Sequence, residues 1–263
     1  MLTLHTFASG SEGNCLLISG AQSHILLDAG ISCKRITESL GALGLTADDL
    51  AAVLITHEHS DHISGLATFT KHHRVPIYTT APTARQLAYR IAGIESLVHH
   101  VKPGDVFTLG EVRVTVFPTS HDTADSVDFR FDDENGGIGV LTDTGCVMDE
   151  AAEALAGADL LVLESNHDVE WLKSGAYPYD LKQRILGDYG HLSNDAAARF
   201  AALMAQRGTK QFVLAHLSRE NNTPQRALDT VCRAVAEFGA SVCVAPRGEL
   251  SCGYTAEVLT CKE

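Results

Sequence analysis

The chain has 263 residues, of which 45% are hydrophobic and 20% are charged, as in an ordinary soluble globular protein. We expect no membrane helix, because no run approaches the roughly 18 apolar residues that one needs. We expect no secretion signal either, because the first residues lack a basic and an apolar region. The formal net charge of −13 argues against a protein that grips a nucleic-acid duplex through many phosphates, since such proteins are usually basic.

Apolar runs alternate with helical patterns along the whole chain, which predicts an α/β fold. Strands are predicted at residues 2–7, 16–19, 24–27, 52–56, 77–80, 112–117, 127–131, 138–142, 160–163, 211–214, 242–245 and 254–259. Helices are predicted at 33–43, 64–73, 82–92, 149–156, 194–206 and 224–238. Residues 133–137 predict a hairpin turn, and Thr223-Pro224 predicts a helix start. Residues 165–193 are predicted to be an irregular insertion.

The loop after the predicted strand 52–56 is the most informative segment, because it packs several possible metal ligands together. It reads Thr56-His57-Glu58-His59-Ser60-Asp61-His62. Alternate side chains of a loop aim in two directions, so His57 and His59 can reach one metal ion while Asp61 and His62 reach a second. Imidazole and carboxylate suit zinc, manganese or iron. A merely polar loop is the alternative in a chain with 13 histidines, but it does not explain four ligands at this spacing.

Three later apolar runs also end in possible ligands. His121 follows the predicted strand 112–117, Asp143 follows 138–142, and His216 follows 211–214. Taken alone, each would be an ordinary residue at the end of a strand. Their order after the His-x-His-x-Asp-His loop, however, resembles the pattern of the metallo-beta-lactamase fold.

The resemblance implies a four-layer αββα sandwich, which we expect to form a single domain over residues 1–263. It also implies two divalent transition-metal ions, with Asp143 bridging them and Asp28 bracing the metal loop. The implied ligands are His57, His59 and His121 for the first ion and Asp61, His62 and His216 for the second. Two such ions can lower the pKa of a shared water and stabilise negative charge that develops on a substrate.

Two further segments distinguish branches of this fold. Glu164 ends the predicted strand 160–163, and His191 lies in Gly190-His191-Leu192-Ser193-Asn194, directly before a helix. These resemble paired loops of the phosphodiesterase branch, which includes tRNA 3′-processing nucleases. The resemblance implies catalytic roles for His191, Glu164 and Asp61, with His191 protonating the leaving oxygen and Glu164 orienting it.

Each of these residues also has an ordinary interpretation. Ser193 is a good helix N-cap, and His191 could simply precede it. Glu164 could be a solvated loop end. His167 is left open between a contact to phosphate and a surface histidine.

A closer resemblance, to the YycJ/WalJ (VicX) branch, covers nearly the whole chain. The segments that carry it are 10–14, 28–30, 57–65, 164–168, 190–194 and 215–222. It implies a 5′-to-3′ exonuclease whose partner is nucleic acid, in particular DNA ends. The branch usually has serine where Glu12 stands, so a phosphate contact of that loop would be weakened here.

The acidic charge has to be reconciled with a nucleic-acid substrate. Two divalent ions would offset about four charges locally, and an enzyme that needs only a strand end can make few phosphate contacts. The local candidates for such contacts are Lys182, Arg184, Arg219 and Arg247. A hydrolase for a small thioester or lactone, which would not require His191, is the alternative function. A non-catalytic module is disfavoured by the intact ligand set.

Aromatic and cysteine residues add two expectations. The insertion 165–193 holds Trp171, for which a plug over one edge of the fold is favoured. A wall on which a terminal base stacks stays open for Tyr177 and Tyr179. The seven cysteines form no Cys-x-x-Cys pair. We expect Cys15, Cys232 and Cys243 among the small core residues and a reducing, cytoplasmic setting.

Overall fold

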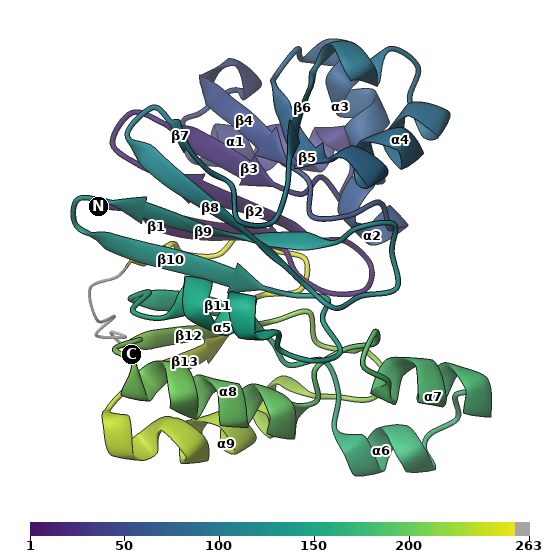
Figure 1. Cartoon of the computed structure of the whole chain (residues 1–263), viewed down its shortest axis with the longest axis vertical. Helices are drawn as coiled ribbons and strands as arrows, with labels where there is room; N and C mark the ends of the chain where they lie inside the picture. The colour runs from purple at the N-terminus through teal and green to yellow at the C-terminus, as the bar shows by residue number, and fades with distance from the viewer. Residues whose placement is uncertain (256–263) are drawn as a thin grey trace.

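The computed structural model describes residues 1–255 of the chain. Two seven-stranded sheets lie face to face, and helices cover the outer face of each (Figure 1). The predicted four-layer αββα sandwich is therefore confirmed. Within residues 1–255, no helix combines the length and the apolar character that a bilayer crossing requires.

The first sheet is antiparallel at one end and parallel at the other. In spatial order its strands are β14 (Tyr254–Thr255), β1 (Thr3–Ala8), β2 (Cys15–Ser19), β3 (His24–Leu27), β4 (Leu50–Leu54), β5 (Ile77–Thr80) and β6 (Val98–Val101). The ladders from β3 to β6 are parallel. Its helices are α1 (Cys33–Ala42), α2 (Ser60–Ile63), α3 (Leu66–His72) and α4 (Ala81–Arg90).

The second sheet is also antiparallel at one end and parallel at the other. In spatial order its strands are β13 (Ser241–Val244), β12 (Gln211–Ala215), β11 (Leu160–Glu164), β10 (Gly136–Leu141), β9 (Val127–Asp133), β8 (Val112–Pro118) and β7 (Val106–Leu109). The ladders from β10 to β13 are parallel. Its helices are α5 (Asp149–Leu155), α6 (Val169–Ser174), α7 (Tyr179–Leu186), α8 (Asn194–Gln206) and α9 (Pro224–Val235).

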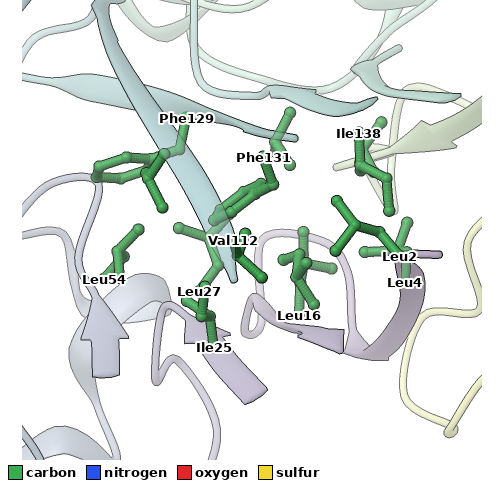
Figure 2. Close-up of a cluster of buried hydrophobic side chains, with 14 of the residues drawn as sticks. Leu2, Leu4, Leu16, Ile25, Leu27, Leu54, Val112, Phe129, Phe131 and Ile138 are labelled. Atoms are coloured by element: carbon green, nitrogen blue, oxygen red, sulfur yellow. The ribbon is translucent and has the colours of Figure 1, made fainter. Parts of the chain in front are cut away.

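The main core lies between the two sheets. Figure 2 shows Ile25 and Leu27 of the first sheet facing Val112 and Phe131 of the second. Because successive side chains of a strand point to opposite faces, each sheet also has an outer apolar face. Those faces are buried against α1, α3 and α4 on one side and against α5, α8 and α9 on the other.

The topology brings the ends of several strands to one edge of the sandwich. Strands β3 to β6 of the first sheet run in one direction, and so do strands β10 to β13 of the second. Strand β8 also runs parallel to β10, because both are antiparallel to β9 between them. Loops that follow β4, β8, β10, β11 and β12 can therefore meet at a common site.

Some predicted elements need correction. Residues 165–193 are not irregular, because they contain α6 and α7. The gap between the predicted helix 82–92 and the predicted strand 112–117 contains the edge strands β6 and β7. Cys232 is exposed on α9 and is not a core residue. Of the predicted strand 254–259, only β14 falls within the described residues.

Candidate metal centre

The seven predicted ligands lie together at the edge where the strands end. Four come from the first sheet, from the loop after β4 and from α2: His57, His59, Asp61 and His62. Three come from the second sheet, from the loops after β8, β10 and β12: His121, Asp143 and His216. The centre is therefore shared between the two sheets.

Possible ligand atoms form four overlapping groups, within each of which they lie no more than 4.8 Å apart. Two of these groups contain Asp143, one with His57 and His62 and the other with Glu164, His191 and His216. The other two groups are called clusters here. The first cluster consists of His57, His59 and His121. The second consists of Asp61, His62 and His216. Asp143 reaches both, because its Oδ2 lies 3.2 Å from His62 Nε2 and its Oδ1 lies 3.7 Å from His121 Nε2. The sequence predicts the same two sets of three ligands with Asp143 shared, and the assignment of each set to one metal ion stays a prediction.

The imidazoles are oriented as metal ligands usually are. The Nδ1 atom of His62 lies 2.7 Å from Asp28 Oδ2, and that of His121 lies 3.1 Å from the Gly190 carbonyl. In both rings Nε2 is thus the atom left for the centre. The Nε2 atom of His57 is buried and makes no hydrogen bond to any described residue. A buried nitrogen without a partner is unfavourable, and a metal ion would satisfy it.

The charges of the centre also fit a cation. Burial lowers the pKa of His216, but nearby carboxylates, chiefly Asp143 and then Asp61 and Glu164, outweigh burial and raise the pKa to about 10. For His62, burial is likewise outweighed by Asp28 and Asp143, which raise its pKa well above the usual range. The carboxylates around both rings thus favour positive charge at this place. A bound metal ion would supply that charge, with the ligating imidazoles neutral.

Asp28 braces the metal loop from beneath. Its Oδ1 accepts from the Thr56 backbone N–H at 2.9 Å, and its Oδ2 accepts from the Thr56 hydroxyl at 3.0 Å and from His62 Nδ1 at 2.7 Å. Gly30 lets this turn pack against the loop, because a Cβ there would lie 1.6 Å from the Asp61 carbonyl oxygen. These contacts agree with the bracing role that the sequence suggests.

Asp28→Asn should weaken metal binding without removing a ligand. An amide cannot accept from His62 and from Thr56 in the same way, so the His62 ring loses its fixed orientation. We expect metal affinity to fall by roughly 10–100-fold, the usual effect of such supporting residues. Titration against a competing chelator measures it, with the exposed Asp195→Asn as control. Unchanged affinity in Asp28→Asn would show that the brace is dispensable.

Glu164 connects the second cluster to His191. Its Oε1 lies 2.7 Å from His191 Nδ1 and 3.0 Å from His216 Nδ1, and its Oε2 accepts from the backbone N–H groups of Thr144 and Leu192. The interpretation as a solvated loop end is wrong, because Glu164 is 0% exposed. Burial raises its pKa, but His191 and the hydrogen bonds outweigh burial and lower the pKa to about 2. Glu164 is therefore a fixed negative charge.

His191 is held so that one ring nitrogen faces the cavity. Burial lowers its pKa, but the Glu164 carboxylate outweighs burial and raises the pKa above the usual value. Because Nδ1 is paired with Glu164, Nε2 is the atom available to a substrate. Ser193 caps α8 as predicted, because its hydroxyl accepts a hydrogen bond from the Ala196 N–H. This capping role of Ser193 is compatible with a catalytic role for His191.

A cavity of about 260 Å³ opens over this centre. Its floor includes the side chains of His59, Asp61, His121, Asp143, His191 and His216. Its wall includes Tyr177, before α7, together with Leu181 and Ile185 of α7. Trp171 does not line it and instead packs under the Arg226 guanidinium, 4.7 Å from the ring centre, and its role as a plug stays a prediction. Tyr179 is 73% exposed and does not line the cavity.

The basic residues considered for phosphate binding separate into two groups. Only Arg184 lines the cavity over the centre. Lys182 donates to two backbone carbonyls, Arg219 pairs with Glu12, and Arg247 contacts the carbonyls of the loop after β12. Their side chains are thus engaged in contacts within the chain.

His167 is buried, with 1% of its surface exposed, so the surface interpretation is wrong. It does not line the cavity either. Burial is the main cause that lowers its pKa to about 4, so it is a neutral imidazole at neutral pH. A packing role behind Asn166, which does line the cavity, fits these observations.

Two supporting residues were not identified from the sequence. The Asn14 amide nitrogen lies 3.2 Å from Asp61 Oδ2 and 3.1 Å from His62 Nε2. Asp128 accepts from the Thr142 N–H at 2.9 Å and so holds the strand end before Asp143, much as Asp28 holds Thr56. The only sequence signal was that Asn14 lies in a segment shared with the YycJ/WalJ branch.

Three residues of the centre have a left-handed backbone. Asp28, Asp143 and His216 have φ values of 61°, 49° and 54°. They are the only non-glycine residues with positive φ among those that the structure describes. Such conformations are unfavourable for residues with a Cβ and cluster at functional sites.

Comparison with known proteins places these features in a family context. Residues 23–217, which include all seven candidate ligands, match the family model described as the beta-lactamase superfamily domain. The chain is 37% identical over 242 residues to Exodeoxyribonuclease YycJ of Bacillus anthracis, with 92% of each chain covered. It is 38% identical over 238 residues to Exodeoxyribonuclease WalJ of Streptococcus pneumoniae serotype 2 (strain D39), covering 89% of this chain and 88% of that one.

A solved structure supports the same fold. The metallo-beta-lactamase fold protein YhfI from Bacillus subtilis superimposes with a TM-score of 0.73 at 18% identity. The superposition covers 95% of this chain and 99% of that chain.

Proposed function

The chain belongs to the beta-lactamase superfamily and to its YycJ/WalJ branch, and on this basis we propose that it is a metal-dependent exodeoxyribonuclease. The relatives named above are exodeoxyribonucleases that match about nine tenths of this chain. The observation that carries the proposal is the His191–Glu164 pair, with Nδ1 and Oε1 2.7 Å apart, beside the two ligand clusters.

The proposed centre holds two divalent transition-metal ions, either zinc, manganese or iron. His57, His59 and His121 would bind the first, and Asp61, His62 and His216 the second, with Asp143 shared. When bound, such ions activate a water and stabilise charge on a phosphate. Asp61 and Asp143 are the only carboxylates in this ligand set, so the bound centre keeps a net positive charge for an anionic substrate.

The residues around the ions would complete the reaction. An alkoxide leaves a phosphodiester poorly, so a proton donor next to the leaving oxygen accelerates cleavage. His191 would supply that proton from Nε2, because Glu164 occupies Nδ1 and favours the charged ring. Glu164 also contacts His216, so one buried carboxylate would orient both the acid and a metal ligand.

The shape and charge of the chain favour action at strand ends. The cavity of about 260 Å³ lies just below the range of ~300–1,000 Å³ usual for ligand pockets, which suits one nucleotide better than a length of duplex. A net charge of −13 likewise suits few phosphate contacts. We also propose that the chain is a single domain, that it digests DNA in the 5′-to-3′ direction and that it acts in the cytoplasm.

Salt and DNA topology test how the substrate is held. The logarithm of the binding constant should fall linearly with the logarithm of the salt concentration. The slope is ~0.9 for each neutralised phosphate, so an enzyme with few phosphate contacts should show a shallow slope. Linear DNA should be degraded and closed circular DNA should resist. Binding at several salt concentrations and gel assays on both DNA forms measure this. Rapid cutting of closed circles would indicate an endonuclease instead.

A panel of substrates separates the proposed nuclease activity from the alternative, a hydrolase for a small thioester or lactone. Metal-loaded protein is incubated with end-labelled DNA and RNA and with panels of thioesters and lactones. We expect digestion of DNA from its ends. Fast hydrolysis of a thioester or lactone, without cleavage of any nucleic acid, would favour the small-molecule hydrolase.

A further inference from the structure

Helix α7 forms one wall of the cavity although it buries none of its own side chains. Leu181, Arg184 and Ile185 turn toward the cavity from this helix, and Tyr177 does so from the residues before it. In Figure 1, α6 and α7 project from the body of the sandwich, apart from the packed pair α8 and α9. A helix that contributes so little to the core is better explained by what it presents to the cavity.

The C-terminal end of α7 is fixed directly to the loops of the metal centre. The His191 N–H donates to the Ile185 carbonyl at 3.1 Å, and the Ser120 hydroxyl donates to the Asp188 carbonyl at 2.8 Å. Gly190 permits this approach, because a Cβ there would lie 2.2 Å from the Ile185 carbonyl oxygen. The side chains of the last turn of α7 are therefore held in a set position relative to the candidate ligands.

Arg184 lies in that last turn and is the only Arg or Lys among the described residues that line the cavity. Its Nε donates to Asp122 Oδ2, and Asp122 directly follows the candidate ligand His121. A guanidinium has five N–H donors in a planar fork, so this contact leaves donors for a second acceptor. The Arg184 side chain is 57% exposed, and exposed ion pairs of this kind contribute little to stability. A phosphate could therefore replace or share the place of Asp122.

We infer that Arg184 binds the 5′-terminal phosphate of the strand being digested, while Tyr177 and Leu181 contact the sugar and base of the same nucleotide. The inference rests on the proposed exodeoxyribonuclease activity and names the part of the substrate that the α7 wall recognises. A terminal phosphate carries about −1.5 to −2 charges, more than a phosphodiester within the chain. A guanidinium fork suits such a group through paired, charge-assisted hydrogen bonds.

The chain offers a closely matched control in Lys210. It pairs with Asp159 at 2.9 Å and its side chain is 58% exposed, so it resembles the Arg184–Asp122 pair. The pair lies at the opposite end of the strands, because Asp159 precedes β11 and Lys210 precedes β12. Lys210→Ala thus removes a similar surface charge far from the centre.

The test compares kcat/KM on one DNA duplex that carries either a 5′-phosphate or a 5′-hydroxyl. Wild type should prefer the phosphate. Arg184→Ala should lose about 10–100-fold on the phosphorylated end, as expected for hydrogen bonds to a charged group, and clearly less on the hydroxyl end. Arg184→Lys should recover part of the loss, because it restores charge without the fork. Lys210→Ala should match wild type on both ends.

Equal losses of Arg184→Ala on both ends, or no loss, would overturn the inference. If wild type digests neither substrate, the proposed activity fails, and binding of thymidine 5′-monophosphate beside thymidine then tests Arg184 alone. Calorimetry should show that wild type and Lys210→Ala prefer the monophosphate and that Arg184→Ala loses the preference. A preference retained in Arg184→Ala would exclude Arg184 as the phosphate contact.

Discussion

Asp143→Ala is expected to remove bound metal and activity together. One carboxylate oxygen lies 3.2 Å from His62 Nε2 and the other 3.7 Å from His121 Nε2, so a single side chain serves both clusters. Its pKa is held well below the usual range, because burial is outweighed by His216 and His62, and it is available as an anion. We expect turnover to fall by more than the roughly 10–100-fold that supporting residues around a metal contribute.

Elemental analysis of the purified variant, together with a nuclease assay, measures both effects. Wild type should carry up to two transition-metal ions per chain. Asp149→Ala is the control, because it removes an exposed aspartate from the first turn of α5. A full metal complement in Asp143→Ala would contradict the shared-ligand assignment, whatever its activity.

His191→Ala is expected to keep its metal ions and its fold but to lose about 10²–10⁴-fold in turnover on DNA, the usual contribution of a general acid. The reason is geometric: His191 lines the cavity and is held by a buried carboxylate at 2.7 Å. A phosphodiester with a good leaving group, such as a nitrophenyl ester, needs no proton donor. Its hydrolysis should therefore be affected much less.

The comparison between the two substrates decides the role of His191. Metal content and thermal unfolding of the variant are measured beside the rates, and His72→Ala, which removes an exposed histidine from α3, serves as control. Equal losses on DNA and on the nitrophenyl ester would indicate that His191 positions phosphate and does not donate a proton.

The candidate ligands could be identified because they lie after strands that are visible in the sequence as apolar runs or as alternating patterns. Strands β4, β10 and β12 are buried along almost their whole length, and the first polar residues after them fall at the shared edge. The His-rich loop after β4 was the recognisable motif. His121, Asp143 and His216 follow it in the order that the metallo-beta-lactamase fold requires. The apolar runs marked the strand ends, and the resemblance to the metallo-beta-lactamase fold implied which of the residues after them approach one another.

The missed elements lack such a signal. Helix α7 buries no side chain, and its apolar residues Leu181 and Ile185 face a cavity and not the core. Strands β6 and β7 lie at the edges of their sheets, where alternation between buried and exposed positions is weak. Helix and strand patterns depend on a core-facing stripe, which these segments do not have.

The supporting contacts could not be predicted for a different reason. Asn14 meets Asp61 across 47 residues of sequence, and Asp128 meets Thr142 across 14. Nothing at either end marks the pairing, because a single asparagine or aspartate is common in loops and at strand ends. Such contacts follow from the packed sheets and become visible only in three dimensions.

The left-handed backbone at Asp28, Asp143 and His216 has a consequence for engineering this protein. A non-glycine residue in that conformation is unfavourable by roughly 1–3 kcal/mol, and glycine would relieve it. A selection for heat resistance alone would therefore reward substitutions at the very positions that support the chemistry. Since stabilising changes at active sites commonly reduce function, a library for a more durable enzyme should hold these three codons fixed and diversify the surfaces of α8 and α9 instead.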